Sequence, residues 1–267
     1  MNDLARVHSP EYLEKLVTSA LSPAEQRRLG VPWSARLWRR SRLAVQGTLD
    51  AARRALAEGI SANLAGGTHH AFTDRGEGFC VLNDVAIAIR ALQAEAAIDR
   101  ALIVDLDVHQ GNGTAQIFSA DASVYALSIH GERNYPATKM RSSLDVALPD
   151  GTGDALYLAV LRDALARSLE EARADIVFYL AGVDVAAGDR YGRFALSDDG
   201  IRQREEHVIS TVRSAGLPLV ITLAGGYAPT PERTAQLHVF AIETACRWTL
   251  ASRVPQAKTA IDECQEP

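Results

Sequence analysis

The order of apolar and polar positions divides the chain into a helical front part and an alternating remainder. From residue 10 to about residue 58, apolar side chains recur every three or four positions, which is typical of amphipathic helices. After Gly59, short apolar runs of strand length alternate with amphipathic stretches of helix length. The expected strands are residues 60–65, 101–108, 123–129, 175–181 and 217–224. The expected helices that follow are residues 84–97, 154–172, 198–215 and about 232–251.

This alternation predicts an α/β fold, in which a mostly parallel sheet is covered by helices on both faces. Ligands of such sheets bind beyond the carboxyl ends of the strands. At those ends the expected strands run into "GGTHHAF", "DLDVHQGNG", "SIHGERNYP", "GVDVAAGDRYG" and "GGYAP". Because packing alone does not require this convergence of polar residues and glycines, we expect a functional site at the carboxyl edge of the sheet.

Composition narrows the class of protein. The 267 residues show no shift that marks a second domain, so we expect one domain over residues 1–267, with the motifs in about 4–250 and a tail at 251–267. A net charge of -5 argues against nucleic-acid binding, which needs a basic face. The chain has no apolar stretch of membrane-spanning length and no signal-peptide pattern, and its three cysteines, Cys80, Cys246 and Cys264, are far apart. We therefore expect a cytoplasmic protein without membrane contacts or a thiolate metal site.

The clearest chemical signal lies at the end of the second expected strand. In a strand, Asp105, Asp107 and His109 would share one face, because residues two apart point the same way. Two carboxylates about 7 Å apart resist burial unless a cation lies beside them. With Asp184 as the best candidate for a third ligand, Asp107 and His109 predict a site for a divalent ion such as zinc or ferrous iron. The alternative interpretation is a buried Asp and His satisfied by backbone donors.

Two further motifs end at the same edge. One imidazole of the pair His69 and His70 can take a proton from water and pass it to a leaving group. The hydroxyl of Tyr227, which follows two glycines, can donate a hydrogen bond to an oxyanion. Taken alone, a double histidine is typical of solvated loops and "GGY" of turns. Their convergence with the carboxylates favours catalysis.

Together these motifs resemble a known family. "GGTHHAFTDRGEGFCVLNDVAIAI", "VDLDVHQGNGT", "LSIH", "AGVDVAAGDRYGRFALS" and "LAGGY" stand in the order found in the histone deacetylase superfamily of metal-dependent deacetylases. The resemblance covers about residues 4–250 and includes "VHSPEYLEKL" near the start. "HQGNG", where most classes carry an acidic residue in place of the asparagine, resembles the class IV branch and its bacterial relatives. The fold that this implies is a three-layer α/β/α sandwich around an eight-stranded, mostly parallel sheet, the arginase/deacetylase fold.

The resemblance also implies roles for single residues. Asp107, His109 and Asp184 match the zinc ligands, with ferrous iron as the alternative metal. The catalytic set that it implies is His70 as general base and acid, His69 as its electrostatic partner, Asp105 as the group that orients His69, and Tyr227 as the group that polarises the carbonyl. The tunnel set is Gly78 and Phe79, with Tyr135 facing Phe79. The ligands implied for a structural potassium ion are Asp105, Asp107, His109, Ser128 and Ile129.

The implied reaction is hydrolysis of an N-acyl amine, usually the side chain of an acyl-lysine in a protein, to a carboxylate and a free amine. An alternative is a small-molecule amidohydrolase acting on acetylpolyamines or similar amines. The non-enzyme alternative is an acyl-lysine-binding module. All six metal, histidine and tyrosine positions of the motif are present, which favours an enzyme.

At several positions this sequence differs from the family pattern, so the family's properties do not all carry over to it. Asn112 stands where most relatives place a carboxylate behind the second histidine, so we expect a lower pKa for His70 than in those relatives. Tyr191 replaces the usual leucine or methionine of the tunnel, and residues 135–154 are longer than the usual "YPGTG" pattern. The helix at "VHSPEYL" comes early, which indicates either a misassigned start or a sheet that lacks the N-terminal edge strand, an edge that a homo-oligomer would cover.

Overall fold

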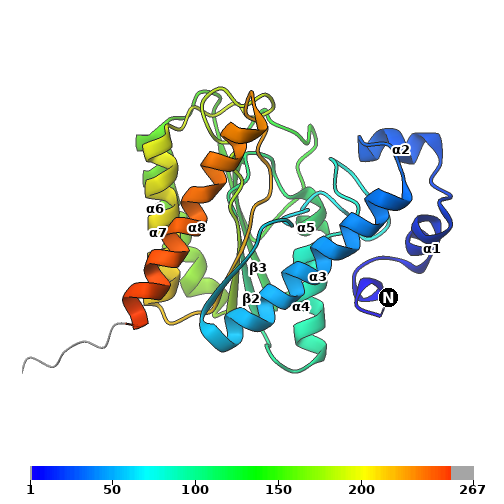
Figure 1. Ribbon diagram of the computed structural model, residues 1–267, viewed down its shortest axis with the longest axis horizontal. Coiled ribbons are helices and arrows are strands. Elements are labelled where there is room, and N and C mark those ends of the chain that lie inside the picture. Colours follow the sequence, from blue (N-terminus) through cyan, green and yellow to red (C-terminus); the bar gives the residue numbers. More distant parts are fainter. Residues whose placement is uncertain (1, 254–267) are drawn as a thin grey trace, which may run out of the picture.

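The computed structural model describes residues 2–253, and its centre is one sheet of six strands. The strands are β1 (Ile60–Asn63), β2 (Ala101–Asp105), β3 (Val124–Gly131), β4 (Leu144–Leu148), β5 (Ile176–Leu180) and β6 (Leu219–Thr222). Their order in the sheet is β1-β6-β5-β2-β3-β4, and every neighbouring pair is parallel. The carboxyl ends of all six strands therefore lie at one edge of the sheet, the upper edge in Figure 1.

Helices cover both faces of this sheet, so the fold is the α/β sandwich that the sequence predicts. The longer helices are α3 (Ala35–Glu58), α4 (Asp84–Ala94), α6 (Asp154–Ala172), α7 (Asp198–Ser214) and α8 (Pro231–Arg253). The shorter ones are η1 (Leu4–Arg6), α1 (Pro10–Thr18), α2 (Pro23–Leu29) and α5 (Asn112–Ile117). In Figure 1, α6, α7 and α8 lie on one side of the sheet and α3, α4 and α5 on the other. None of the described helices is long and apolar enough to cross a membrane.

The helical front part that the sequence predicts consists of three helices, α1, α2 and α3. Ser9 and Ser22 each accept a hydrogen bond from a backbone N–H of the following turn, and each is followed by a proline at the first helical position. Such Ser-Pro pairs are strong helix starts, because the hydroxyl caps an unpaired amide and proline lacks the amide that would go unpaired. Gly30, with φ of 78°, ends the second helix in a left-handed conformation.

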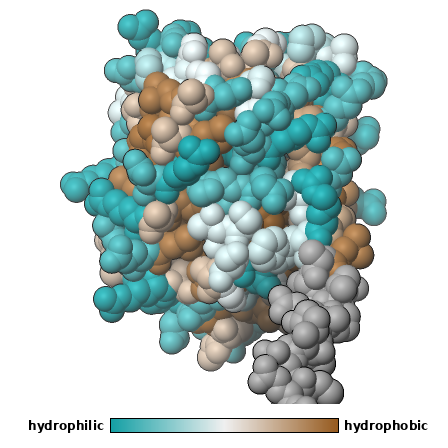
Figure 2. All heavy atoms as spheres, turned by 90° about the vertical axis from the view of Figure 1, so that its left-hand side faces the viewer, coloured by the Kyte–Doolittle hydropathy of each residue, from teal (hydrophilic) through white to brown (hydrophobic). Residues whose placement is uncertain are grey.

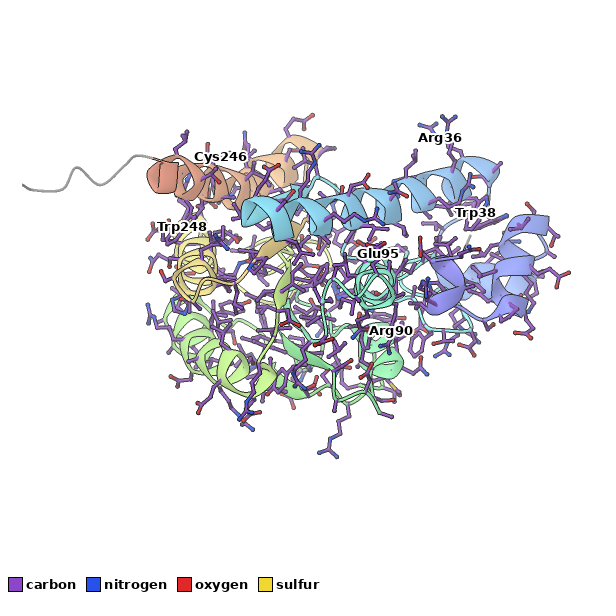
Figure 3. The ribbon with its side chains drawn as sticks, turned by 90° about the horizontal axis from the view of Figure 1, so that it is seen from below. Arg36, Trp38, Arg90, Glu95, Cys246 and Trp248 are labelled. Atoms are coloured by element: carbon purple, nitrogen blue, oxygen red, sulfur yellow. The ribbon has the colours of Figure 1, made fainter. Side chains whose placement is uncertain are left out.

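Two apolar layers hold the sheet between its helices. One layer packs α1, α3 and α4 against the sheet, and the other packs α6, α7 and α8 against the opposite face. Every residue of β2 and of β5 is buried, as expected for central strands covered on both sides. Figure 2 shows the outer surface over α6, α7 and α8 as largely hydrophilic, with only small hydrophobic groups. In Figure 3, Glu95 at the end of α4 lies beneath α3, whose Arg53 reaches it at 2.5 Å.

The structure corrects four details of the sequence prediction. The sheet has six strands among the described residues, fewer than the eight of the family fold, and the described segment before β1 contains helices only, as the early helix led us to expect. The second strand ends at Asp105 and not at residue 108. Strand β4 and helix α5 were not predicted. Residues 135–154, expected to form a long loop, contain β4 as an edge strand.

Candidate metal centre and active site

The predicted site residues come from the carboxyl ends of different strands. Asp105 is the last residue of β2, whereas Asp107 and His109 lie in the bend after it. Asp184 follows β5, and Tyr227 follows β6. Simple strand alternation therefore does not bring Asp105, Asp107 and His109 together, as the sequence had suggested. The bend after β2 does so instead.

Asp107, His109 and Asp184 form a compact buried group. One ligand atom from each lies within 4.8 Å of the others. The Nδ1 atom of His109 is 2.9 Å from Asp107 Oδ1 and 3.1 Å from Asp184 Oδ2. Two carboxylates and one imidazole at these distances are a suitable donor set for zinc or ferrous iron. The residues thus fit the metal that the motif implies.

Burial and neighbouring charges shift the pKa values of this group. Burial, with the neighbouring charge of Asp107, raises the pKa of Asp184 to about 7. Burial alone would lower the pKa of His109, but its hydrogen bonds to both carboxylates raise it to about 10. In the metal-free chain, protons thus balance the negative charge of the group, and a divalent cation would take over that task.

Gly225, the first residue of the "GGY" motif, lies against the metal-ligand group. Its N–H donates a hydrogen bond to Asp107 Oδ2 at 2.8 Å. A methyl group at this position would overlap the carboxylate oxygens of both Asp107 and Asp184. Glycine is required because the backbone itself approaches the metal group.

His69 is paired with a carboxylate. Its Nδ1 is 2.7 Å from Asp105 Oδ2, and its Nε2 faces Asp107 Oδ1 at 3.8 Å. Burial alone would lower the pKa of His69, but Asp105 and Asp107 outweigh it and raise the pKa to about 9. These two carboxylates thus favour the imidazolium form of His69.

His70 is paired with an amide. Its Nδ1 lies 2.7 Å from Asn112 Oδ1, and its ring centroid is 4.1 Å from that of His69. Burial, followed by the positive charge of His69, holds the pKa of His70 well below its usual value. The hydrogen bond to Asn112 acts in the opposite direction but is outweighed, so His70 is neutral at physiological pH. That its pKa is lower than in relatives with a carboxylate at this position stays a prediction.

Glu77 is a site residue that the sequence analysis missed. Asn112 Nδ2 donates to Glu77 Oε1 at 3.1 Å, and the hydroxyl of Tyr135 donates to the same oxygen. Arg75 lies 3.4 Å from the other carboxylate oxygen. Because a carboxylate only accepts hydrogen bonds, Glu77 fixes which end of the Asn112 amide faces His70. Sequence offered no signal for this, since 35 residues separate Glu77 from Asn112.

The predicted tunnel residues line an outer cavity of about 370 Å³ that reaches His70 and His109. Gly78, Phe79, Tyr135, Tyr191 and Tyr227 all line it. The Tyr191 ring lies 4.8 Å from that of Tyr227 and 6.3 Å from that of Phe79. Tyr135, expected to face Phe79, packs edge-on against His70 at 5.0 Å and shares the cavity with Phe79. Phe79 has φ of 68°, an unusual backbone conformation for a bulky residue.

A second, inner cavity of about 320 Å³ begins at the same groups. His70, His109 and Tyr227 line both cavities. The inner one continues between α3 and the loop after β1, past Ser41, to Arg40. The candidate metal centre therefore lies where two cavities meet.

The residues predicted to hold potassium include Asp107 and His109 of the metal group, together with three residues of β2 and β3. Asp105 and Ser128 are register partners in the neighbouring strands β2 and β3, and both are buried. Ile129 follows in β3 and is also buried. The hydroxyl of Ser128 is 2.9 Å from His130 Nδ1. A carboxylate and a hydroxyl side by side are a suitable oxygen set for a hard monovalent cation.

Fold and site together define an α/β protein with a candidate metal centre at the carboxyl edge of its sheet, a common arrangement in hydrolases. Residues 1–242 match the histone deacetylase domain. The chain is 48% identical over 225 residues to an uncharacterized protein of Picosynechococcus sp., covering 84% of this chain and 75% of that protein. It is 34% identical over 248 residues to histone deacetylase 2 of Arabidopsis thaliana, covering 86% of this chain and 62% of the relative.

A bacterial relative also matches. The histone deacetylase-like amidohydrolase of Pseudomonas aeruginosa is 30% identical over 243 residues, which cover 85% of this chain and 63% of the relative. The chain thus spans less than two thirds of the length of the Arabidopsis and Pseudomonas proteins. This chain belongs to the histone deacetylase family and is a hydrolase of that family.

Proposed function

We propose that this protein hydrolyses the amide bond of N-acyl-lysine in proteins, with a metal held by Asp107, His109 and Asp184. The observation that carries the proposal is the buried metal-ligand group at the junction of two cavities, with a neutral histidine and a tyrosine beside it. The outer cavity, lined by the rings of Phe79, Tyr135, Tyr191 and Tyr227, suits the apolar stem of a lysine side chain. The inner cavity has room for the acyl group and for the carboxylate product.

Zinc is the metal that this donor set suits best, and ferrous iron is the alternative. When bound, the metal would polarise the acyl carbonyl and make water a stronger nucleophile. Asp105, Asp107, His109, Ser128 and Ile129 would hold a structural potassium ion. The proposed cellular location is the cytoplasm.

His70 acts as general base and then as general acid. Its Nδ1–H donates a hydrogen bond to Asn112 Oδ1, so its Nε2 carries the free lone pair that can accept a proton from the attacking water. The same Nε2 then returns the proton to the departing lysine amine. Glu77 supports this by holding the Asn112 amide in the orientation that this tautomer of His70 requires.

His69 and Tyr227 stabilise the charge that develops. The imidazolium of His69, held by Asp105, places a fixed positive charge beside the reacting carbonyl. Burial, with the charges of Asp107 and Asp184, raises the pKa of Tyr227. The tyrosine therefore stays protonated and can donate its hydrogen bond to the oxyanion.

Hydrolysis of acylated small amines, such as acetylpolyamines, is the alternative activity of the same site, and a non-catalytic acyl-lysine-binding protein is the alternative without chemistry. Purified, zinc-loaded protein would be assayed on fluorogenic acetyl-lysine, trifluoroacetyl-lysine and long-chain acyl-lysine peptides. Tyr227→Phe and His70→Ala should abolish most of the rate, whereas Tyr125→Phe, at a tyrosine bonded to Glu171 on α6, should not. Absence of hydrolysis together with absence of bound metal would refute the proposal.

A further inference from the structure

The mouth of the outer cavity carries an unbalanced positive charge. Among the described residues, three arginines line this cavity and no carboxylate does. Arg28 comes from α2, Arg133 from the turn after β3, and Arg193 from the loop after β5. All three are exposed, whereas His70 and His109 at the inner end are buried. The arginines therefore mark the rim, and the histidines mark the floor.

This charge is not a consequence of the overall composition. The chain has 33 acidic and 28 basic residues, so a random rim would contain more carboxylates than cations. Arg193 is paired with Asp150 at 3.2 Å, but Arg28 and Arg133 form no ion pair with any described residue. Two rim cations are thus available to a ligand.

The carboxylates near the rim are already engaged. Glu77 is held by Arg75, Asn112 and Tyr135. Asp189 accepts hydrogen bonds from the backbone N–H groups of Tyr191, Gly192 and Tyr227. Neither side chain lines the outer cavity, so the arginines make the electrostatic potential at its mouth positive.

We propose that the Arg28–Arg133–Arg193 rim selects acyl-lysine in polypeptide segments whose neighbouring residues are Asp or Glu, and disfavours acylated polyamines. This inference rests on the proposed function. When the lysine side chain fills the cavity, the adjacent residues of the polypeptide, spaced about 3.5 Å apart, lie over the rim. Carboxylates there would meet unpaired guanidinium groups, whereas the free ammonium groups of a polyamine would be repelled.

The test compares three acetyl-lysine peptides of identical length, with Glu, Gln or Lys on both sides of the acetyl-lysine, and includes N-acetylputrescine and free Nε-acetyl-lysine. We expect kcat/KM to fall in the order Glu, Gln, Lys, with about a tenfold difference between the ends at low salt. The difference should shrink to about twofold at roughly 0.5 M salt, because ions screen exposed charges. N-acetylputrescine should be a poorer substrate than the Gln peptide.

The Arg28→Glu/Arg133→Glu double variant should reverse the order of the peptides mainly through KM, since the rim lies away from the reacting atoms. Arg162→Glu on α6, an exposed arginine that lines neither cavity, is the matched control and should keep the wild-type order. Equal kcat/KM for the three peptides, or preference for N-acetylputrescine, would overturn the rim assignment and leave the hydrolase intact. Failure to cleave any substrate would overturn both.

Discussion

His69 and His70 are neighbours in the sequence and in space, yet their surroundings give them opposite protonation states. Behind His69 stands the carboxylate of Asp105, and the pKa of this histidine is raised to about 9. Behind His70 stands the amide of Asn112, and the pKa of that histidine lies well below its usual value. Burial is similar for both, so the difference comes from the group behind each ring and from the charge of the other ring.

The comparison shows how one loop can supply two functions. Two adjacent imidazoles in equal surroundings would compete for one proton. Here Asp105 at the end of β2 and Asn112 at the start of α5 assign the charge to His69. The charge on His69 then helps to keep His70 neutral.

The largest effect is expected from removing each imidazole in turn. His70→Ala should lower kcat by about 10³-fold, because proton transfer to and from the reacting atoms is lost. His69→Ala should lower it less, by about tenfold to a hundredfold, since only a stabilising charge is lost. Turnover of an acetyl-lysine peptide measures both, with His207→Ala on α7 as a control outside the site. Equal losses for the two variants would remove the distinction drawn between the rings.

Removing the carboxylate behind His69 should come next. In Asp105→Asn, a neutral amide replaces the carboxylate that stabilises the imidazolium, so the pKa of His69 falls. We expect kcat/KM to fall by about tenfold. Urea unfolding measured on the same protein separates this effect from loss of stability. A variant with unchanged kcat/KM would show that the charge of His69 is not used.

Placing a carboxylate behind His70 should shift the pH profile. In Asn112→Asp, the imidazolium of His70 is stabilised and its pKa rises. Because the neutral base exists only above that pKa, the acidic limb of the kcat/KM profile should move about one unit to higher pH, with little change on the plateau. Profiles recorded between about pH 5 and pH 9 test this, since both limbs report groups of the free enzyme. An acidic limb that stays in place would contradict the assignment of His70 as the base.

The smallest effect is expected at Glu77, which acts on His70 only through Asn112. Glu77→Gln keeps an acceptor oxygen for Asn112, so kcat should change by less than about twofold, whereas Glu77→Ala frees the amide to rotate and should cost about fivefold. The separate values of kcat and KM distinguish a positioning effect from a change in the tunnel wall through Tyr135. Identical behaviour of the two variants would argue against the proposed role.

Periodicity alone predicted most of the fold. The helix predicted at residues 154–172 has the bounds of α6, and the five predicted strands are all present. Strand β4 was missed because its five residues lie among turn residues at the edge of the sheet, where alternation is short and weak. The bounds of the front helices were not predicted, because short caps separate them: Ser22 and Pro23 start α2, Gly30 ends it, and Ser34 caps α3.

The sequence allowed prediction of those site residues that lie directly after the expected strands. Asp107, His109 and Asp184 converge because parallel strands deliver them to one edge, even though β2 ends before two of them. Glu77 was not predictable, since its hydrogen bonds to Asn112 and Tyr135 depend on how three loops pack. The arginine rim was equally hidden, because Arg28, Arg133 and Arg193 come from separate segments of an arginine-rich chain.

The central claim is that hydrolysis depends on one metal ion held by Asp107, His109 and Asp184. The most direct measurement is a zinc titration of chelator-stripped protein, with bound metal and hydrolysis of an acetyl-lysine peptide followed in the same samples. We expect the rate to rise with added zinc and to saturate at about one ion per chain, and we expect Asp184→Ala to lose both binding and rate. Full activity in the stripped protein, or a wild-type rate in Asp184→Ala, would contradict the central claim.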